Sequence, residues 1–191
     1  MDRFALISLL ALAALGGGSG PRAAEPLVPT TQTSIGIFYL PDAPATAELW
    51  RAGDPGQRLH LQGRLLSESG APIAGALVEL WHADAGGGVD ETRYRSAQRT
   101  GPDGSFGIKT ILPGHIEMAR DNEVFAPRHI HVVVTHPDHE RLVSLIFFKG
   151  DERLAGTPYP ELAVTLERAE TPAGELLFGL VELVVRAAGD R

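Results

Sequence analysis

Alternation of apolar and polar residues with a period of two is the main pattern of this 191-residue chain, and it is clearest over residues 59–65. Side chains alternate between the two faces of a strand, so this period predicts a strand and not a helix. Further predicted strands follow at short intervals, separated by Gly and Pro turn residues: 76–81, 94–100, 105–111, 129–135, 142–148, 162–167 and 176–185. Short strands at this spacing predict an all-β fold, either a sandwich or a barrel.

The pattern is different before residue 59. Residues 1–24 contain an arginine, then an apolar stretch over 4–15, then small residues, which is the order of a secretory signal peptide. The apolar stretch is too short to cross a bilayer. We therefore expect an exported protein, periplasmic or secreted, with no membrane segment after processing. Residues 25–58 are rich in proline yet carry apolar side chains, which predicts an arm laid over a domain of residues 59–191.

Composition narrows the class of partner. A formal net charge of -7 argues against nucleic acid, because a protein that binds a polyanion needs a basic face. The chain has no cysteine, so no disulfide can form and the fold must rest on its core alone. The apolar arm also offers a surface for a second copy of the chain, so a homo-oligomer stays an open prediction.

Two histidines at the start of one predicted strand are the main candidates for chemistry. His129 and His131 are two positions apart, so their side chains point to the same face of the strand. Neutral imidazole is a common metal ligand. The spacing alone fits a half-site for a metal and a pair of solvent-facing histidines about equally well.

Several motifs resemble, in order along the chain, those of the intradiol ring-cleavage dioxygenases. They are T-S-I-G-I-F-Y-L-P (33–41), G-A-L-V-E-L-W-H-A-D (75–84), R-S-A-Q-R-T-G-P-D-G-S-F (95–106), T-I-L-P-G (110–114), P-R-H-I-H (127–131) and F-F-K-G-D (147–151). The resemblance implies an antiparallel β-sandwich in which a ferric ion, held by two tyrosines and two histidines, opens catechol-type rings with O2. The two histidine ligands correspond to His129 and His131.

Four positions of this chain differ from the family's functional residues. The two tyrosine ligands fall on Val89 and Ile116, the family's arginine on Ala126 and its glutamine on Leu145. Tyrosinates are hard anionic donors that stabilise Fe(III), whereas two neutral imidazoles fit that ion poorly. The chain therefore carries half of the family's ligand set in recognisable form.

Four further residues are candidates for completing the site. Tyr94 is a possible ligand or simply the aromatic residue that opens the strand 94–100. If His115 or Glu117 turns inward, the set becomes three histidines, or two histidines and a carboxylate. Either set suits Fe(II), Cu(II) or Zn(II) better than Fe(III). The alternative for His115 is an exposed turn residue. Arg128 is a candidate for steadying an anionic substrate.

Two functions from different classes follow. The resemblance implies a non-haem iron dioxygenase, an oxidoreductase of aromatic catabolism that takes a small aromatic diol and O2, with activity retained, altered or lost. The alternative is an exported metal-binding or non-catalytic β-sandwich protein with a rebuilt histidine site. The remaining histidines are interpreted as structural: His60 in a strand, His82 after a strand, and His136 and His139 flanking a hairpin turn.

Overall fold

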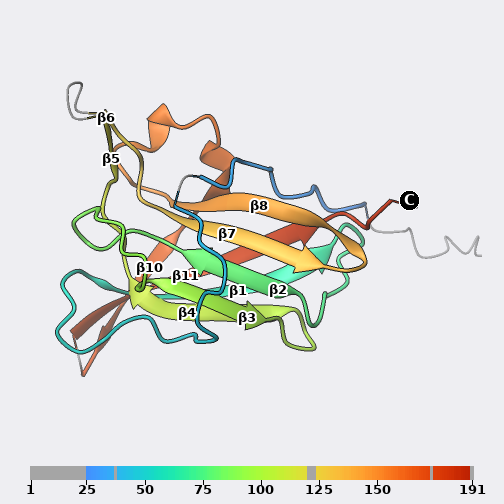
Figure 1. Cartoon of the computed structure of the whole chain (residues 1–191), viewed down its shortest axis with the longest axis horizontal. Helices are drawn as coiled ribbons and strands as arrows, with labels where there is room; N and C mark the ends of the chain where they lie inside the picture. Colours follow the sequence, from blue (N-terminus) through green and yellow to red (C-terminus); the bar gives the residue numbers. More distant parts are fainter. Residues whose placement is uncertain (1–24, 37, 120–123, 173, 190–191) are drawn as a thin grey trace, which may run out of the picture.

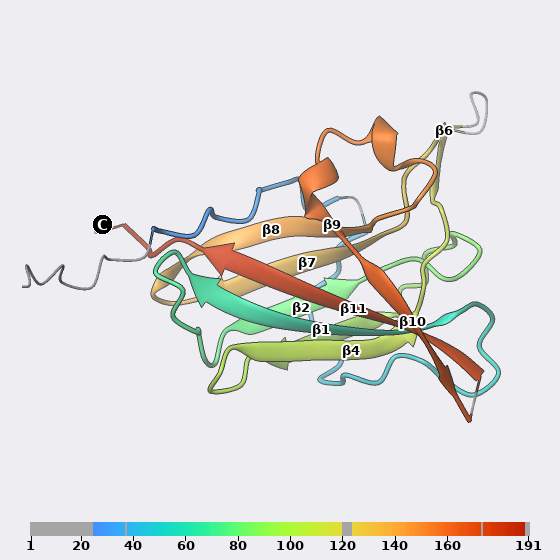
Figure 2. The same cartoon turned by 180° about the vertical axis from the view of Figure 1, so that it is seen from behind.

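The computed structural model describes residues 25–36, 38–119, 124–172 and 174–189, which form two β-sheets packed face to face (Figure 1). This confirms the predicted all-β sandwich. The first sheet has the strand order β10-β11-β1-β4 and is the nearer layer in Figure 2. Its members are β1 (Arg58–Ser67), β4 (Ser105–Ile111), β10 (Leu166–Thr171) and β11 (Gly174–Val185).

The second sheet carries the His129/His131 pair and has the strand order β3-β2-β7-β8-β9. Its members are β2 (Leu77–Trp81), β3 (Arg95–Arg99), β7 (His129–His136), β8 (His139–Phe148) and β9 (Ala163–Val164). A small two-stranded sheet, β5 (Glu117–Ala119) with β6 (Val124–Phe125), lies beside it. The described residues contain helix only as two 3-10 turns, η2 (Leu154–Gly156) and η3 (Pro160–Leu162).

The ladders contain two parallel pairs that the alternation pattern did not predict. β1 pairs with β11 in parallel over its whole length, and β8 pairs in parallel with the short β9. The predicted strand 162–167 is wrong in its bounds, because Leu162 closes η3 and the segment is then divided between β9 and β10. Pairing with distant strands decides both features, so neither is visible in local periodicity.

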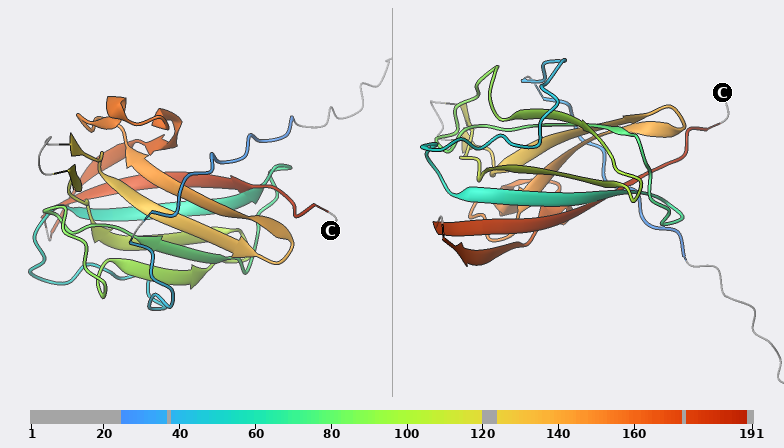
Figure 3. Two further views of the ribbon diagram at one scale, coloured as in Figure 1. Left: turned by 45° about the horizontal axis from the view of Figure 1, so that its top comes forward. Right: turned by 90° about the horizontal axis from the view of Figure 1, so that it is seen from below.

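The hydrophobic core lies between the two layers, which are separated in the right-hand view of Figure 3. On β7, alternate residues Ile130, Val132 and Val134 face this core and are essentially inaccessible to solvent. Leu59, Leu61 and Leu65 face it from β1. The period of two therefore leaves His129 and His131 on the other face of the second sheet.

That outer face is covered by the arm. Thr33 donates its backbone N–H to the carbonyl of Val143 on the free edge of β8. Farther along, the ring of Tyr39 lies against Trp81 of β2, and the N–H of Ala97 in β3 bonds to the carbonyl of Pro44. In Figure 1 the blue arm crosses in front of β8 and β7. Covering explains why the first six residues of β7 are all buried, on both of its faces.

The predicted signal peptide, residues 1–24, lies outside the described residues. Among the residues that are described, no helix has the length and apolar character needed to cross a membrane.

Candidate metal centre

His129 and His131 converge at the start of β7. Their Nε2 atoms are 3.2 Å apart and their rings meet edge to face, with centroids 4.8 Å apart. Both side chains are buried, with 8% and 9% of their surfaces exposed. The strand period places both rings on one face, and the arm closes that face over them. The predicted pair is therefore brought together as a unit with two nitrogen atoms facing each other.

The surroundings keep both imidazoles neutral. Burial lowers the pKa of His129, and burial together with the neighbouring His129 and His82 lowers the pKa of His131 to about 3. The Nδ1 of His129 lies 2.6 Å from the carbonyl oxygen of Pro127, an acceptor, so this nitrogen carries the proton. The Nε2 of His129 therefore presents a lone pair, which is the form that binds a metal.

His131 is packed against two neighbours. Its ring stacks on Trp81, its cross-strand neighbour, with centroids 4.7 Å apart and planes within 4° of parallel. Gly36 of the arm lies close to the Cε1 corner of the ring. The Nδ1 of His131 is buried and has no hydrogen-bond partner in the part of the chain that is described. Ring position is thus set by packing, with one nitrogen left facing His129.

There is no room for a side chain at Gly36, and this allows a test of the contact between the arm and His131. It has φ +76°, and a Cβ there would lie 2.9 Å from Cε1 of His131. We expect Gly36→Ala to displace the ring or the arm and to lower the free energy of unfolding by about 1–3 kcal/mol more than a matched control, as overpacking does. The control is Gly53→Ala, with φ +90° and no atom within 4 Å of the added Cβ. Urea unfolding of both variants measures the difference; equal losses would contradict the contact.

The donor set decides which metal the pair suits. With metal–nitrogen bonds of about 2.0–2.1 Å, nitrogens 3.2 Å apart subtend about 100° at a shared metal, an ordinary angle for divalent ions. Among the described residues no group of three or more His, Cys, Asp or Glu is gathered closely enough to hold a metal. The family's tyrosine positions are the apolar Val89 and the buried Ile116. Two neutral imidazoles without an anionic donor do not fit Fe(III).

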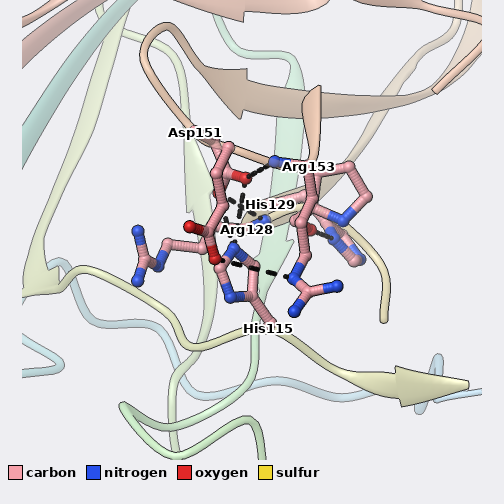
Figure 4. Close-up of polar contacts among 7 residues, drawn as sticks. His115, Arg128, His129, Asp151 and Arg153 are labelled. Atoms are coloured by element: carbon pink, nitrogen blue, oxygen red, sulfur yellow. Dashed lines mark hydrogen bonds and ion pairs between the residues drawn. The ribbon is translucent and has the colours of Figure 1, made fainter. Parts of the chain in front are cut away.

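His115 does not join the pair. Its Nε2 lies 3.0 and 3.1 Å from the two carboxylate oxygens of Asp151, as Figure 4 shows. The Asp151 side chain is only 1% exposed and also accepts the backbone N–H groups of Arg128 and Arg153. These bonds, with the His115 imidazole, hold the pKa of Asp151 low despite burial, which raises it. The predicted set of three histidines is therefore not formed, because a buried carboxylate binds the third ring.

Tyr94, Glu117 and Arg128 are also placed away from a ligand role. Tyr94 is buried in the core, where its ring packs on His82 and under the guanidinium of Arg93. Glu117 is exposed on β5. The backbone of Arg128 is tied to Asp151, and nothing in the described contacts brings its side chain to the histidines. The carboxylate set with Glu117 is not formed either.

Three important neighbours were not among the sequence candidates: Asp151, Trp81 and Glu79. Asp151 ends the last motif of the resemblance, so its position was visible although its contact with His115 was not. The buried Glu79 accepts a hydrogen bond from the hydroxyl of Tyr39, and Tyr39 in turn packs on Trp81. Burial and the Glu79 carboxylate raise the pKa of Tyr39. The period of two puts Glu79, Trp81 and His131 on one face of the sheet, so the sequence pattern could have identified Glu79 and Trp81 as neighbours of the histidine pair.

Sequence comparisons show which proteins this chain is similar to. A family described as Dioxygenase matches residues 39–166. The chain is 30% identical over 145 residues to a 6-chlorohydroxyquinol 1,2-dioxygenase of Cupriavidus pinatubonensis, covering 65% of this chain and 52% of that protein. It is 32% identical over 146 residues to catechol 1,2-dioxygenase 2 of Acinetobacter lwoffii, covering 65% and 53%. The chain thus spans about half the length of these curated relatives.

Solved structures show the same fold. The 3-chlorocatechol 1,2-dioxygenase of Rhodococcus opacus 1CP superposes with a TM-score of 0.77 at 21% identity, over 83% of this chain and 73% of that one. The dioxygenase domain of a carbohydrate-binding fusion protein from Streptomyces sp. SirexAA-E gives 0.71 at 30% identity, over 84% and 100%. Family match, motif order and fold agree: the chain belongs to the intradiol ring-cleavage dioxygenase family.

Proposed function

We propose that this protein is an exported, divergent dioxygenase that acts on small catechol-type aromatics with O2, using a non-haem metal ion held by His129 and His131. The observation that carries the proposal is the histidine pair itself: two buried, neutral imidazoles whose Nε2 atoms lie 3.2 Å apart. Relatives of the chain include dioxygenases named for catechol, hydroxyquinol and protocatechuate. Aromatic diols are accordingly the substrate class we assign.

The metal in this proposal is a divalent ion, with Fe(II) first, because the donor set lacks the anions that Fe(III) needs. When bound, such an ion supplies Lewis acidity and redox chemistry. The chain's own part is to orient the two rings: Pro127 fixes the proton on His129, and Trp81 with Gly36 fixes the plane of His131. The arm keeps bulk water from the outer face of β7.

One observation favours a second candidate, an exported metal-binding protein without ring-opening activity. The positions of the family's tyrosines, arginine and glutamine hold Val89, Ile116, Ala126 and Leu145, so none of these four side chains can donate to a metal or bond to a diol. In this alternative the pair still binds a divalent ion, and the domain serves as a carrier or a binding module.

The test loads the purified protein with Fe(II) without O2 and then measures bound iron, the visible spectrum and O2 uptake with catechol, protocatechuate and hydroxyquinol. We expect bound iron, no tyrosinate-to-iron colour, and O2 uptake with a ring-opened product. His129→Ala/His131→Ala should lose both the iron and the uptake, while His60→Ala, on β1 in the other sheet, should lose neither. Iron retained without uptake supports the second candidate. Iron binding unchanged by the double substitution contradicts both.

A further inference from the structure

A second pair of histidines lies at the other end of the same strand. His136 ends β7 and His139 begins β8, and the two are cross-strand partners across a two-residue turn. In Figure 1 this hairpin lies at the end of β7 opposite its start, near the C-terminus of the chain. The five residues from His131 to His136 span about 16 Å at the rise of a strand, so the two pairs are separate.

The geometry of this pair resembles that of the first. The Nδ1 atoms of His136 and His139 are 3.1 Å apart, and the rings meet at 70° with centroids 4.9 Å apart. At metal–nitrogen bonds of about 2.0–2.1 Å, that separation again subtends about 100° at a shared metal. The Nδ1 of His136 also accepts the backbone N–H of Asp138, so it carries a lone pair and not a proton.

The hairpin is already ordered by other contacts, so metal binding there costs little conformational entropy. The N–H of Glu140 bonds to the carbonyl of Arg186, and the N–H of Ala188 bonds to the carbonyl of Asp138, so the C-terminal segment lies along the turn. The His136 side chain is 16% exposed, so an ion can reach it from solvent. The exposed Asp138 carboxylate, 4.0 Å from Nδ1 of His136, adds negative charge beside the pair.

We propose that His136 and His139 form a second, independent metal site: an open two-histidine chelate, at the tip of the β7–β8 hairpin, for a divalent transition-metal ion. Two imidazole donors with solvent completing the shell suit Cu(II), Ni(II) and Zn(II), and among these Cu(II) binds nitrogen ligands most tightly. On metal binding the Nδ1 proton of His139 moves to its Nε2, and the metal replaces that proton and the backbone N–H of Asp138 at the lone pair of His136 Nδ1. Nothing in this site depends on the function of the His129/His131 pair.

The test uses Cu(II) and a chain in which His129→Ala/His131→Ala removes the first pair, so that the two proposals fail separately. Cu(II) is titrated against a weak competing chelator, and the bound ion is examined by electron paramagnetic resonance. We expect one tightly bound equivalent whose spectrum shows hyperfine structure from two imidazole nitrogens. In the same background His136→Ala or His139→Ala should weaken binding by at least about tenfold and remove the two-nitrogen pattern.

Two controls keep the result interpretable. His60→Ala in the same background removes a histidine of β1 and should leave the bound copper unchanged. His139→Asn keeps an N–H donor for Nδ1 of His136 but removes the metal-binding imidazole, so it serves where an alanine variant does not fold. Copper affinity that is unchanged in His139→Asn, or no tight copper in the background chain, overturns the proposal.

Discussion

Introducing both missing phenols, Val89→Tyr with Ile116→Tyr, is expected to give an iron-loaded protein with a visible tyrosinate-to-iron absorption band that the wild-type protein lacks. Phenolate oxygen is the hard anionic donor that two imidazoles do not supply. The two loops concerned are connected to residues that contact the His129/His131 pair. Residue 89 lies eight positions after Trp81, and Trp81 stacks on His131. The carbonyl of Ile116 accepts the N–H of Ala126, which comes directly before Pro127, the residue that orients His129.

These loops also touch each other, so it is reasonable to introduce the two tyrosines together. A Cβ on Gly87 would lie 2.1 Å from the carbonyl oxygen of His115, so the 82–94 loop packs directly on the segment that carries Ile116. Ile116 is buried, and a larger ring there is expected to cost about 1–3 kcal/mol of stability through overpacking. Glycine at 87, with φ +90°, is what permits the approach.

The matched control for this experiment is Val89→Phe with Ile116→Phe, which adds the same rings without the phenolic oxygens. The phenylalanine variant should be equally destabilised, bind no more Fe(III) than the wild type, and stay colourless. Absorption spectra of the three iron-loaded proteins at equal iron content make the comparison. A folded tyrosine variant without the band would show that positions 89 and 116 do not face the His129/His131 pair.

Acidification is expected to destabilise the fold through His82 by about 3 kcal/mol between pH 6.5 and pH 4. This ring is fully enclosed and neutral: its Nδ1 donates to the carbonyl of Ala83, and its Nε2 accepts from the hydroxyl of Thr110. Burial lowers the pKa of His82 to about 4 from an ordinary value of 6.5. The unfolded chain therefore binds more protons than the folded chain in this window. The stability that depends on a neutral His82 is fully present above pH 6.5, and the free energy of unfolding falls as the pH approaches 4.

The experiment compares urea unfolding of the wild type and His82→Gln from pH 7.5 to pH 4. Glutamine can donate and accept hydrogen bonds but does not titrate, so its curve should be flatter by the contribution of His82. Taking the difference between the two proteins cancels the contributions of titratable groups that do not interact with His82. Parallel curves over the whole range would contradict the assignment of this pH dependence to His82.

Much of the fold follows from local pattern. The strand 105–111 was predicted with the bounds that β4 has, and the valine-rich segment after His129 is β7, because a period of two in side-chain polarity reports directly on a pleated backbone. The common face of His129 and His131 follows from the same period. The strand 162–167 was mispredicted, since parallel pairing with β8 and antiparallel pairing with β11 divide it in a way that local sequence does not record.

The completion of the candidate site was not predictable in the same way. Whether His115 turns to His129 or to Asp151 depends on a residue 36 positions away that is buried at the same end of the second sheet. Likewise, the arm was expected to cover the domain, yet only the folded chain places Gly36 against His131. Contacts of this kind are set by how distant segments pack, and periodicity carries no information about them.

By itself, then, the sequence determined the all-β strand content and the common strand face of His129 and His131, which are properties of a backbone that repeats every two residues. Its resemblance to the family implied the two-layer sandwich and the loss of the two phenols at 89 and 116. Only the tertiary structure decided which ring nitrogens face each other, that Asp151 binds His115, and that His82 is sealed in a neutral state. The reason is that burial and long-range hydrogen bonds set the hydrogen-bond partner and the protonation state of each imidazole. Burial and these bonds arise only when the sheets and the arm pack together.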